Sequence, residues 1–334
     1  MRRNPAIVFT AAVAVTALLS PAAANAATTA SAPPATADAV AKKRSGGSDL
    51  GRNLETLTRN AAWKKTSTID LGFDTFHPQG MVVTGDRIYL SSVEIIEPTV
   101  RYPSPVDGKD RTVGRGVGHL FVMDRTGRLL HDIRLGEGDS YHPGGIDTDG
   151  RNIWVSVAEY RPNSHAIVYR VDMRTLKGTK IFEADDHVGG IVYDRARKRL
   201  VGNTWGSRRF YEWDLRGREK RTWLNPSHFI DYQDCAYVGR SKAACTGVTN
   251  LPAQPGGKPY ELGGIALIDL VTTKVLNEVP MQEWSRAGHV ATRNPVHLAA
   301  DGDSLTMYAA PDDSDEGDTT GKGTQILVYT ATIG

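Results

Sequence analysis

Three histidines stand at equivalent points of a sequence unit that repeats along this chain of 334 residues. Each unit starts at a polar residue, runs into a short apolar stretch, turns, and continues into a second apolar stretch. The clearest copies begin at His77, His142 and His187, and weaker copies begin at Asp231 and Asn294. Equivalent residues of a repeat architecture lie on one face of the protein, so we expect these side chains to form a ring around a common axis.

Imidazole and carboxylate side chains that meet at one point could hold a metal ion. From His77, His142, His187 and Asp231 we expect a site for one divalent ion, Zn, Fe or Mn in preference to Ca. A His₃ set leaves coordination positions open for water and substrate, and a bound ion lowers the pKa of its water. The alternative is a structural ring whose side chains hydrogen-bond buried water and backbone groups.

Two glutamates recur at a fixed distance from the histidines. Glu94 follows His77 by 17 residues, and Glu159 follows His142 by the same interval, in each case at the end of the second apolar stretch. This spacing places both carboxylates in the next ring outward from the axis. We expect them to act as general acid or base, or to orient the histidines.

Aromatic and basic residues near the same face could bind a substrate. Trp205 and Tyr160 could stack on a sugar or an aromatic ring, and packing between repeats is the alternative role. Arg161 and Arg208 could bind a carboxylate or phosphate group, or could be ordinary surface charges.

The segment 97–117 interrupts the first repeat and is rich in basic residues, among them Arg101, Lys109 and Arg111. We expect this segment to project over the mouth of the axis. Arg101 is a further candidate for binding an anionic group there.

The elements that must position these residues are strands. Each unit divides into four stretches of alternating apolar and polar residues separated by turn residues, and helical periodicity is nearly absent after residue 65. The fifth unit is one stretch short, and Lys65–Gly72 could supply the missing strand. Such a closure removes exposed sheet edges. We therefore predict an all-β fold, a five-bladed β-propeller closed by an N-terminal strand, with a six-bladed form as the alternative.

The region before the repeats indicates export. A positive start, an apolar run and an Ala-Asn-Ala site indicate a secretory signal peptide over residues 1–26. We expect a disordered Ala/Thr/Pro-rich linker over residues 27–48, a short helical lead-in over 49–64, and the propeller domain over 65–334. The mature protein is then expected to be secreted and extracellular, with no membrane attachment after signal cleavage.

Charge and cysteine content narrow the possible partners. Removal of Arg2 and Arg3 with the signal peptide changes the formal net charge from +2 to zero, which gives no electrostatic case for nucleic acid or an anionic membrane. We expect a monomer. Cys235 and Cys245 are the two cysteines of the chain, and we predict that they form a structural disulfide. The acidic run 312–318 departs from a calcium loop and is expected to be a solvated loop.

With the repeats assigned, the chain resembles secreted bacterial β-propellers of unassigned function and, distantly, the gluconolactonase/senescence-marker superfamily. In that superfamily an acidic metal ligand followed by Gly-Pro opens an inner strand, as His77-Pro78-Gln79-Gly80 does here with His in place of Glu. The stretch Gln79-Gly80-Met81 before a Tyr-containing strand is also similar to plant-type glutaminyl cyclases, which implies their activity as a third possibility. In those enzymes a Glu is expected on the second strand, and here Glu94 stands at its end.

These observations support competing functional hypotheses. The first is a metal-dependent hydrolase or lyase that acts at the axial His site on a polar extracellular substrate, either a small molecule or an oligomer. The rival is a non-catalytic propeller that binds an extracellular ligand or protein through the same face. No G-x-S-x-G nucleophile motif occurs in the sequence, which removes one common route to hydrolysis.

Overall fold

The structure is a computed structural model that describes residues 46–253, 257, 259–316 and 323–333. Nearly all of its regular structure is β, with a single α-helix, α2 (Gly46–Thr56), among the described residues. That part of the chain holds no helix long and apolar enough to span a bilayer. The predicted signal peptide 1–26 and residues 27–45 of the predicted linker lie outside the described residues.

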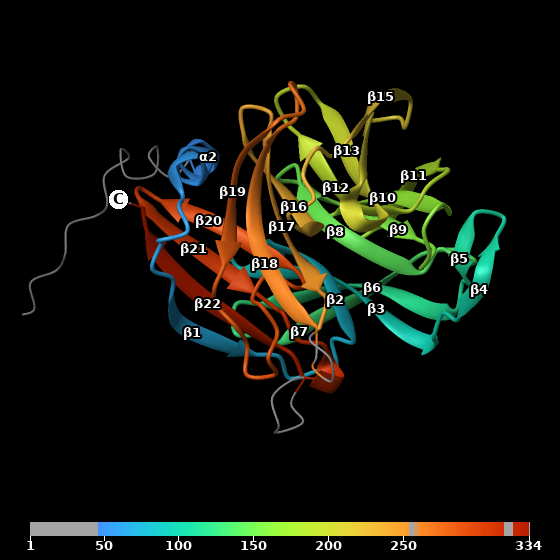
Figure 1. The fold of residues 1–334 in the computed structure, drawn as a ribbon, viewed down its shortest axis with the longest axis horizontal. Coiled ribbons are helices and arrows are strands. Elements are labelled where there is room, and N and C mark those ends of the chain that lie inside the picture. The colour runs from blue at the N-terminus through green and yellow to red at the C-terminus, as the bar shows by residue number, and fades with distance from the viewer. Residues whose placement is uncertain (1–45, 254–256, 258, 317–322, 334) are drawn as a thin grey trace, which may run out of the picture. The chain divides into compact units, whose positions relative to one another are not determined.

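Most strands form antiparallel sheets of four in which the order in space follows the order in the chain (Figure 1). The first sheet contains β2 (His77–Val83), β3 (Arg87–Glu97), β6 (Arg115–Asp124) and β7 (Leu129–Leu135). The second contains β8 (His142–Thr148), β9 (Asn152–Ala158), β10 (Ala166–Asp172) and β11 (Gly178–Ala184). The third contains β12 (Val188–Asp194), β13 (Arg199–Thr204), β14 (Arg209–Trp213) and β15 (Glu219–Leu224), and one parallel pair joins β12 to β8. The fourth contains β16 (Asp231–Gly239), β17 (Lys242–Leu251), β18 (Tyr260–Asp269) and β19 (Val275–Met281).

The last sheet combines strands from both ends of the domain. Its strands β20 (Val296–Asp301), β21 (Ser304–Ala309) and β22 (Gln325–Thr332) come from the C-terminal part of the chain. β1 (Lys64–Asp70) pairs antiparallel with β22, with Ser67 opposite Val328. The N-terminal stretch that the sequence suggested as a missing strand therefore does supply the outermost strand of this sheet.

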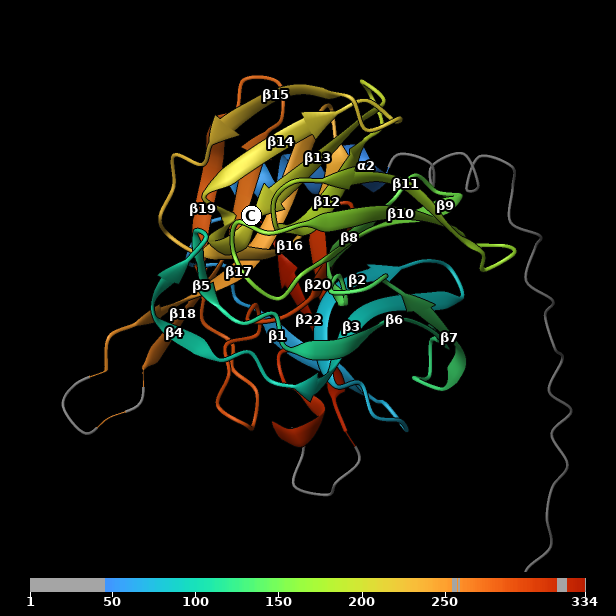
Figure 2. The ribbon, with the colours of Figure 1, turned by 90° about the vertical axis from the view of Figure 1, so that its right-hand side faces the viewer.

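The first strands of the sheets lie against one another around an axis. β8 contacts β2, β12 and β16, and β2 contacts β20 (Figure 2). Between neighbouring sheets, fully buried side chains pack face to face, as Val82 and Leu120 do against Ile146 and Val155. Burial of such aliphatic side chains stabilises the fold by about 2 kcal/mol each. Sheets that radiate in this way from their first strands form a β-propeller.

α2 covers part of one end of this arrangement. It begins earlier and ends earlier than the lead-in 49–64 expected from the sequence. Leu50 and Leu54 are buried against the fourth and last sheets, which fixes the apolar face of the helix. The amide of Asn277 donates hydrogen bonds of 2.8 Å to the carbonyls of Leu54 and Leu57. These bonds satisfy carbonyls that the end of a helix leaves free, so the chain can leave the helix after Thr56.

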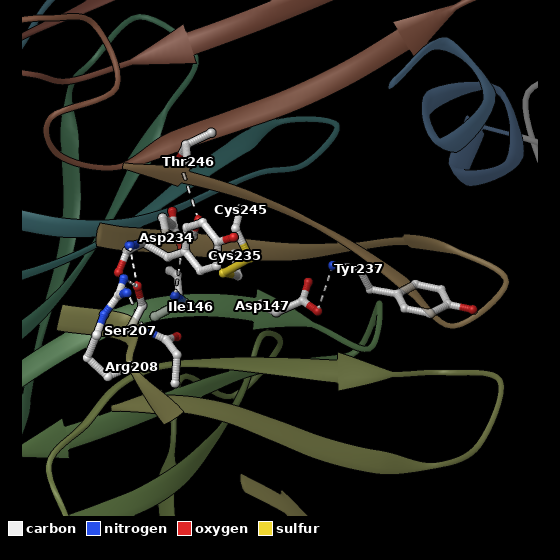
Figure 3. Close-up of a disulfide and its surroundings, with 11 residues drawn as sticks. Ile146, Asp147, Ser207, Arg208, Asp234, Cys235, Tyr237, Cys245 and Thr246 are labelled. Carbon is white, nitrogen blue, oxygen red and sulfur yellow. Dashed lines mark hydrogen bonds between the residues drawn. A yellow bond between two sulfur atoms is a disulfide. The ribbon is translucent and has the colours of Figure 1, made fainter. Parts of the chain in front are cut away.

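The predicted disulfide is confirmed. Cys235 on β16 and Cys245 on β17 are directly opposite each other in the antiparallel pair, and their sulfurs are bonded (Figure 3). The bridge lies beside Asp234, which is a buried carboxylate on the axis.

Segment 97–117 does not form an open loop. β3 and β6 remain paired out to Glu97 and Arg115, and a two-stranded ribbon of β4 (Arg101–Val106) and β5 (Lys109–Arg111) continues beyond them. Figure 1 shows this ribbon standing out past the ends of β3 and β6. We call residues 98–114 the strap.

Candidate functional site

A pocket of about 360 Å³ lies where the first strands of the sheets begin. His77, His142, His187 and Asp231 all line it, although they come from four different repeats. Each stands at the start of β2, β8 or β16, or just before β12, because the repeats share one register. The ring expected from the sequence thus supplies four of its five members to one cavity, together with Tyr160 and Trp205.

His77 is held by side chains at both ring nitrogens. Its Nδ1 lies 2.9 Å from Oδ1 of Asp313, and its Nε2 lies 2.8 Å from the amide nitrogen of Gln79. The carboxylate accepts, so Nδ1 carries the proton and Nε2 accepts from the amide. Burial raises the pKa of the Asp313 carboxyl, but the hydrogen bond from His77 and the charge of Arg293 outweigh burial and leave the pKa below its usual value. Asp313 is therefore an ionised partner that fixes the tautomer of His77.

His187 is fixed in the same tautomer by a backbone group. Its Nδ1 donates to the carbonyl of Glu159 over 2.8 Å. Burial lowers the pKa of His187 to about 4, so the ring is neutral at physiological pH. The Nε2 of a neutral imidazole with a protonated Nδ1 carries a free lone pair. His187 thus presents a base on the pocket wall.

The His142 imidazole lies between these two rings. Its ring centroid is 6.1 Å from that of His77 and 6.1 Å from that of His187. Both its ring nitrogens are buried without a partner among the described residues, and the ring stacks on Tyr160 at 4.1 Å. Burial lowers its pKa well below the usual value, and the imidazoles of His77 and His187 lower it further. An orphaned buried imidazole costs stability, and at a pocket its nitrogens are open to a ligand.

Two aromatic rings form a wall beside the imidazoles. Trp205, which follows β13, meets His187 edge-on at 4.8 Å and lies 5.8 Å from Tyr160. The guanidinium of Arg111, from the strap, lies 4.7 Å from the centroid of the Trp205 ring. Flat apolar faces beside polar nitrogens suit a ligand that has both a ring face and hydrogen-bonding groups.

Asp231 is the carboxylate of the pocket, and it is paired. Arg208 donates to its Oδ1 over 3.0 Å and to the carbonyl of Ser227 over 2.9 Å. Burial raises the pKa of Asp231, and the nearby charge of Arg208 opposes that rise. Arg208 thus neutralises Asp231 and does not line the pocket itself.

Asn294 stands one step back from the cavity. It does not line the pocket, and its amide donates to Oδ1 of Asp313 over 3.0 Å and to the carbonyl of Pro311 over 3.1 Å. The fifth member of the ring therefore acts through Asp313, which is the partner of His77.

The other site residues expected from the sequence do not line the pocket. The Glu94 carboxylate is 3.6 Å from His119 on the first sheet and does not line the pocket. The Glu159 carboxylate pairs with Arg161 over 2.5 Å, so this residue meets the site through its carbonyl alone. Arg101 is exposed on the strap, 3.0 Å from Asp110.

Among the residues that the structure describes, no group of three His, Cys, Asp or Glu side chains is arranged to hold a metal ion. The geometry gives the reason. Gln79 and Asp313 occupy both ring nitrogens of His77, so neither nitrogen is free to bind an ion.

Two residues that define the site are not evident from the sequence. Gln79 belongs to the first repeat, but its contact with His77 depends on a side-chain conformation. Asp313 belongs to the acidic run 312–318, whose composition predicts a solvated loop, and a separation of 236 residues hides its contact with His77. The Asp313 side chain is only 22% exposed, so for this residue the solvated-loop interpretation was wrong.

Solved structures that are similar to this chain share little sequence with it. A luciferin-regenerating enzyme is 12% identical, with a TM-score of 0.45 and coverage of 82% of this chain and 95% of that chain. A DUF4221 family member from Bacteroides vulgatus is 10% identical, with a TM-score of 0.38 and coverage of 83% and 100%. The β-propeller domain of the Trilobed protease from Pyrococcus furiosus is 12% identical, with a TM-score of 0.32 and coverage of 73% and 67%.

No curated protein matches the sequence. The profile of one family matches residues 40–332, which is most of the chain and includes every residue of the pocket. The chain therefore belongs to the family of unknown function DUF6454.

Proposed function

We propose that the protein is a secreted five-bladed propeller enzyme, a hydrolase or lyase, whose axial pocket binds a small polar substrate and uses His77 as general base. In this proposal the consecutive sheets of four strands are the blades, and the pairing of β1 with β22 closes the ring. The disulfide between Cys235 and Cys245 supports a site of action outside the cell, where such bonds persist.

The observation that carries the proposed activity is the pair formed by Asp313 and His77. Asp313 holds the proton on Nδ1, so the basic Nε2 faces the pocket, where Gln79 now donates to it. A substrate hydroxyl or a water molecule that replaces the Gln79 amide would find an oriented base at hydrogen-bond distance. Removal of a proton from water leads to hydrolysis, and removal of a proton from carbon leads to elimination.

The other pocket residues have roles that follow from their contacts. Trp205 and Tyr160 offer faces for a ring of the substrate. His187 and His142 are neutral, so they can accept a hydrogen bond from a substrate hydroxyl without the cost of burying a charge. In this proposal Asp313, rather than Glu94 or Glu159, is the carboxylate that orients a histidine.

A metal-dependent form of the same activity is the second candidate, and the free nitrogens of His142 favour it. A divalent ion between the three imidazoles would need Nε2 of His77 to be released by Gln79. Asp313 and the Glu159 carbonyl would then be the outer partners that metal-bound histidines normally have. Such an ion would supply an acidified water molecule in the pocket.

The test of the activity is turnover on defined probes. We would assay p-nitrophenyl acetate, glucono-δ-lactone and a peptide with an N-terminal glutamine, because these report ester hydrolysis, lactone hydrolysis and glutaminyl cyclisation. The His77→Gln and Asp313→Asn variants should lower kcat/KM by about 100-fold on the probe that is turned over. His165→Gln is the matched control, because His165 also pairs with a carboxylate, Glu183 at 3.2 Å, outside the pocket. Turnover by His77→Gln at the wild-type rate would overturn the assignment.

Metal dependence is tested separately by isothermal titration with Zn²⁺ and Mn²⁺ after treatment with chelator. One bound ion that is lost in His142→Ala supports the metal-dependent form. Turnover by chelator-treated protein with no heat of binding leaves His77 as a base that works without metal.

A further inference from the structure

The tip of the strap is a two-residue hairpin turn. Val106 pairs with Lys109, and the two residues between them, Asp107 and Gly108, have φ angles of 50° and 74°. Two consecutive positive φ values define the type I′ turn, whose twist matches that of paired strands. The tip of the strap is therefore a defined two-residue turn that holds the ends of β4 and β5 together.

This ribbon belongs to the first sheet but contacts the second and third repeats. Arg111 lies over the ring of Trp205, which follows β13 and lines the pocket. Asn163, in the connection between β9 and β10, donates to the Gly108 carbonyl over 2.9 Å. Tyr141, just before β8, donates to the Val113 carbonyl over 2.6 Å.

Those contacts place the strap at the pocket mouth. Trp205 is at once the surface on which Arg111 rests and a wall of the cavity. Burial is the main cause of the lowered pKa of His187, and the charge of Arg111 lowers it further.

Little apolar surface holds the strap in this position, although the Arg111 side chain is only 13% exposed. Val100 is 62% exposed and Val106 is 52% exposed, so the ribbon has no apolar core of its own. Segments with few buried contacts open locally at a small fraction of the global free energy of unfolding.

The base of the strap has the features of a hinge. Regular strand pairing is interrupted between the pair Glu97–Arg115 and the pair Arg101–Arg111. In between, the Thr112 N–H donates to the Val100 carbonyl over 2.9 Å, and the Val100 N–H donates to the Thr112 hydroxyl over 2.8 Å. Gly114 lies in the gap with a φ of 69°, where a Cβ would meet the Glu97 carbonyl oxygen at 2.6 Å. A glycine is required for this backbone conformation, and its φ angle can change there at a lower steric cost than at any other residue type.

We propose that the strap gates the axial pocket, with the Arg111 guanidinium on the Trp205 ring as its latch. When latched, it limits entry to small ligands and excludes water from His187. When Arg111 leaves Trp205, the ribbon swings on the segment around Gly114 and opens the mouth. This inference rests on the proposed function only in taking the pocket as the ligand site.

The experiment measures access to the pocket and needs no substrate. Diethylpyrocarbonate modifies neutral imidazoles, and peptide mass spectrometry gives the rate at His187 relative to exposed His131 on β7. In Arg111→Gln, loss of the cation–π contact should raise the relative rate about threefold to tenfold. Arg101→Gln is the matched control, because Arg101 pairs with the same Asp110 but does not contact Trp205. A rate unchanged in Arg111→Gln, or raised equally in Arg101→Gln, overturns the latch.

A second variant, which lacks the whole strap, tests gating independently of any single side chain. Replacing residues 98–114 with Asn-Gly joins the paired residues Glu97 and Arg115 by a two-residue turn and removes the strap. The rate at His187 should then rise at least about tenfold with an unchanged Tm, because the segment that opens locally is gone. An unchanged rate in a folded strapless protein would overturn gating. Since modification needs no turnover, gating can hold even if every hydrolase and cyclase probe fails.

Discussion

The axis of this propeller carries two sets of polar side chains, the buried carboxylates of Asp234 and Asp147 and the imidazoles at the pocket mouth. The two sets differ in how many of their polar atoms have a hydrogen-bond partner. Asp234 accepts the backbone N–H groups of Met81 and Ile146, at 2.8 and 3.1 Å. Asp147 accepts the backbone N–H of Tyr193 over 2.9 Å. It also accepts that of Tyr237 over 3.2 Å (Figure 3). At the mouth, by contrast, His142 is just as buried and has no partner at either nitrogen among the described residues.

The difference follows from what each set of side chains contacts along the axis. The first strand of each sheet has an open edge facing the axis, and its N–H groups need acceptors. Asp234 joins the first and second sheets to the fourth in this way, and Asp147 joins the second to the third and fourth. The imidazoles satisfy no such edge, apart from the single bond of His187 to a carbonyl. Groups left without partners at a cavity are available to a ligand.

The largest effect should come from removing a satisfied carboxylate. Asp234→Ala leaves the buried N–H groups of Met81 and Ile146 without an acceptor, and we expect a loss of about 2–5 kcal/mol in the free energy of unfolding. Asp234→Asn keeps one acceptor oxygen and should lose about half as much. Urea unfolding followed by circular dichroism measures both. A loss below about 1 kcal/mol in Asp234→Ala would mean that the carboxylate does not hold the inner strands.

The two sets should also respond to pH in opposite directions. Burial raises the pKa of Asp147 to about 6, so between pH 4 and 6 the folded protein keeps a proton that the unfolded chain has lost. Its contribution to stability is present below pH 4 and is lost as the pH rises through 6. Burial lowers the pKa of His187 to about 4 from 6.5, so its contribution is present above pH 6.5 and is lost as the pH falls through 4. Each of these contributions to the free energy of unfolding amounts to about 3 kcal/mol.

In the wild type these trends partly cancel, and variants should separate them. Relative to wild type, the free energy of unfolding of Asp147→Asn should increase as the pH rises from 4 to 6.5, while that of His187→Gln should decrease. Urea unfolding at several pH values in this window gives both differences. Slopes of the same sign would show that the two sets do not differ in the way their burial implies.

A somewhat smaller loss of stability is expected when the disulfide beside Asp234 is removed. Cys235 and Cys245 enclose a loop with a sequence separation of 10, for which loop closure predicts about 2–3 kcal/mol. The double variant Cys235→Ala/Cys245→Ala should lose that amount of stability and leave the modification rate of His187 unchanged. A changed rate would show that the pocket depends on this part of the axis.

The strands and the axial histidines were predictable because both follow from local patterns. Alternation with a period of two defines the strands, and the repeat register places His77, His142 and His187 at equivalent strand starts. The disulfide could be predicted for the same reason, since Cys235 and Cys245 flank one hairpin.

The parts that could not be predicted depend on contacts between distant segments. Nothing in the acidic run marks Asp313, rather than Asp312 or Asp315, as the partner of His77. Asp234 was similarly hidden, because its role needs N–H groups from two other sheets. Glu94 does follow His77 at the same interval as Glu159 follows His142. This interval does not show toward which face of the sheet each side chain points. Sequence patterns gave the positions of the pocket histidines without giving their partners.

The smallest effect on stability, and the sharpest test of the comparison, should come from His142→Phe. A phenyl ring keeps the stacking on Tyr160 and removes two buried nitrogens that have no partner. Because unsatisfied buried polar atoms destabilise a fold, we expect the free energy of unfolding to stay the same or rise by about 1 kcal/mol. Turnover or metal binding in the pocket should fall, as expected where function is maintained against stability. His142→Ala is the control, because it loses the stacking as well and should cost about 2 kcal/mol through the cavity it leaves. If His142→Phe instead destabilised the protein by as much as Asp234→Asn, the imidazole would be a structural group like the carboxylates below it.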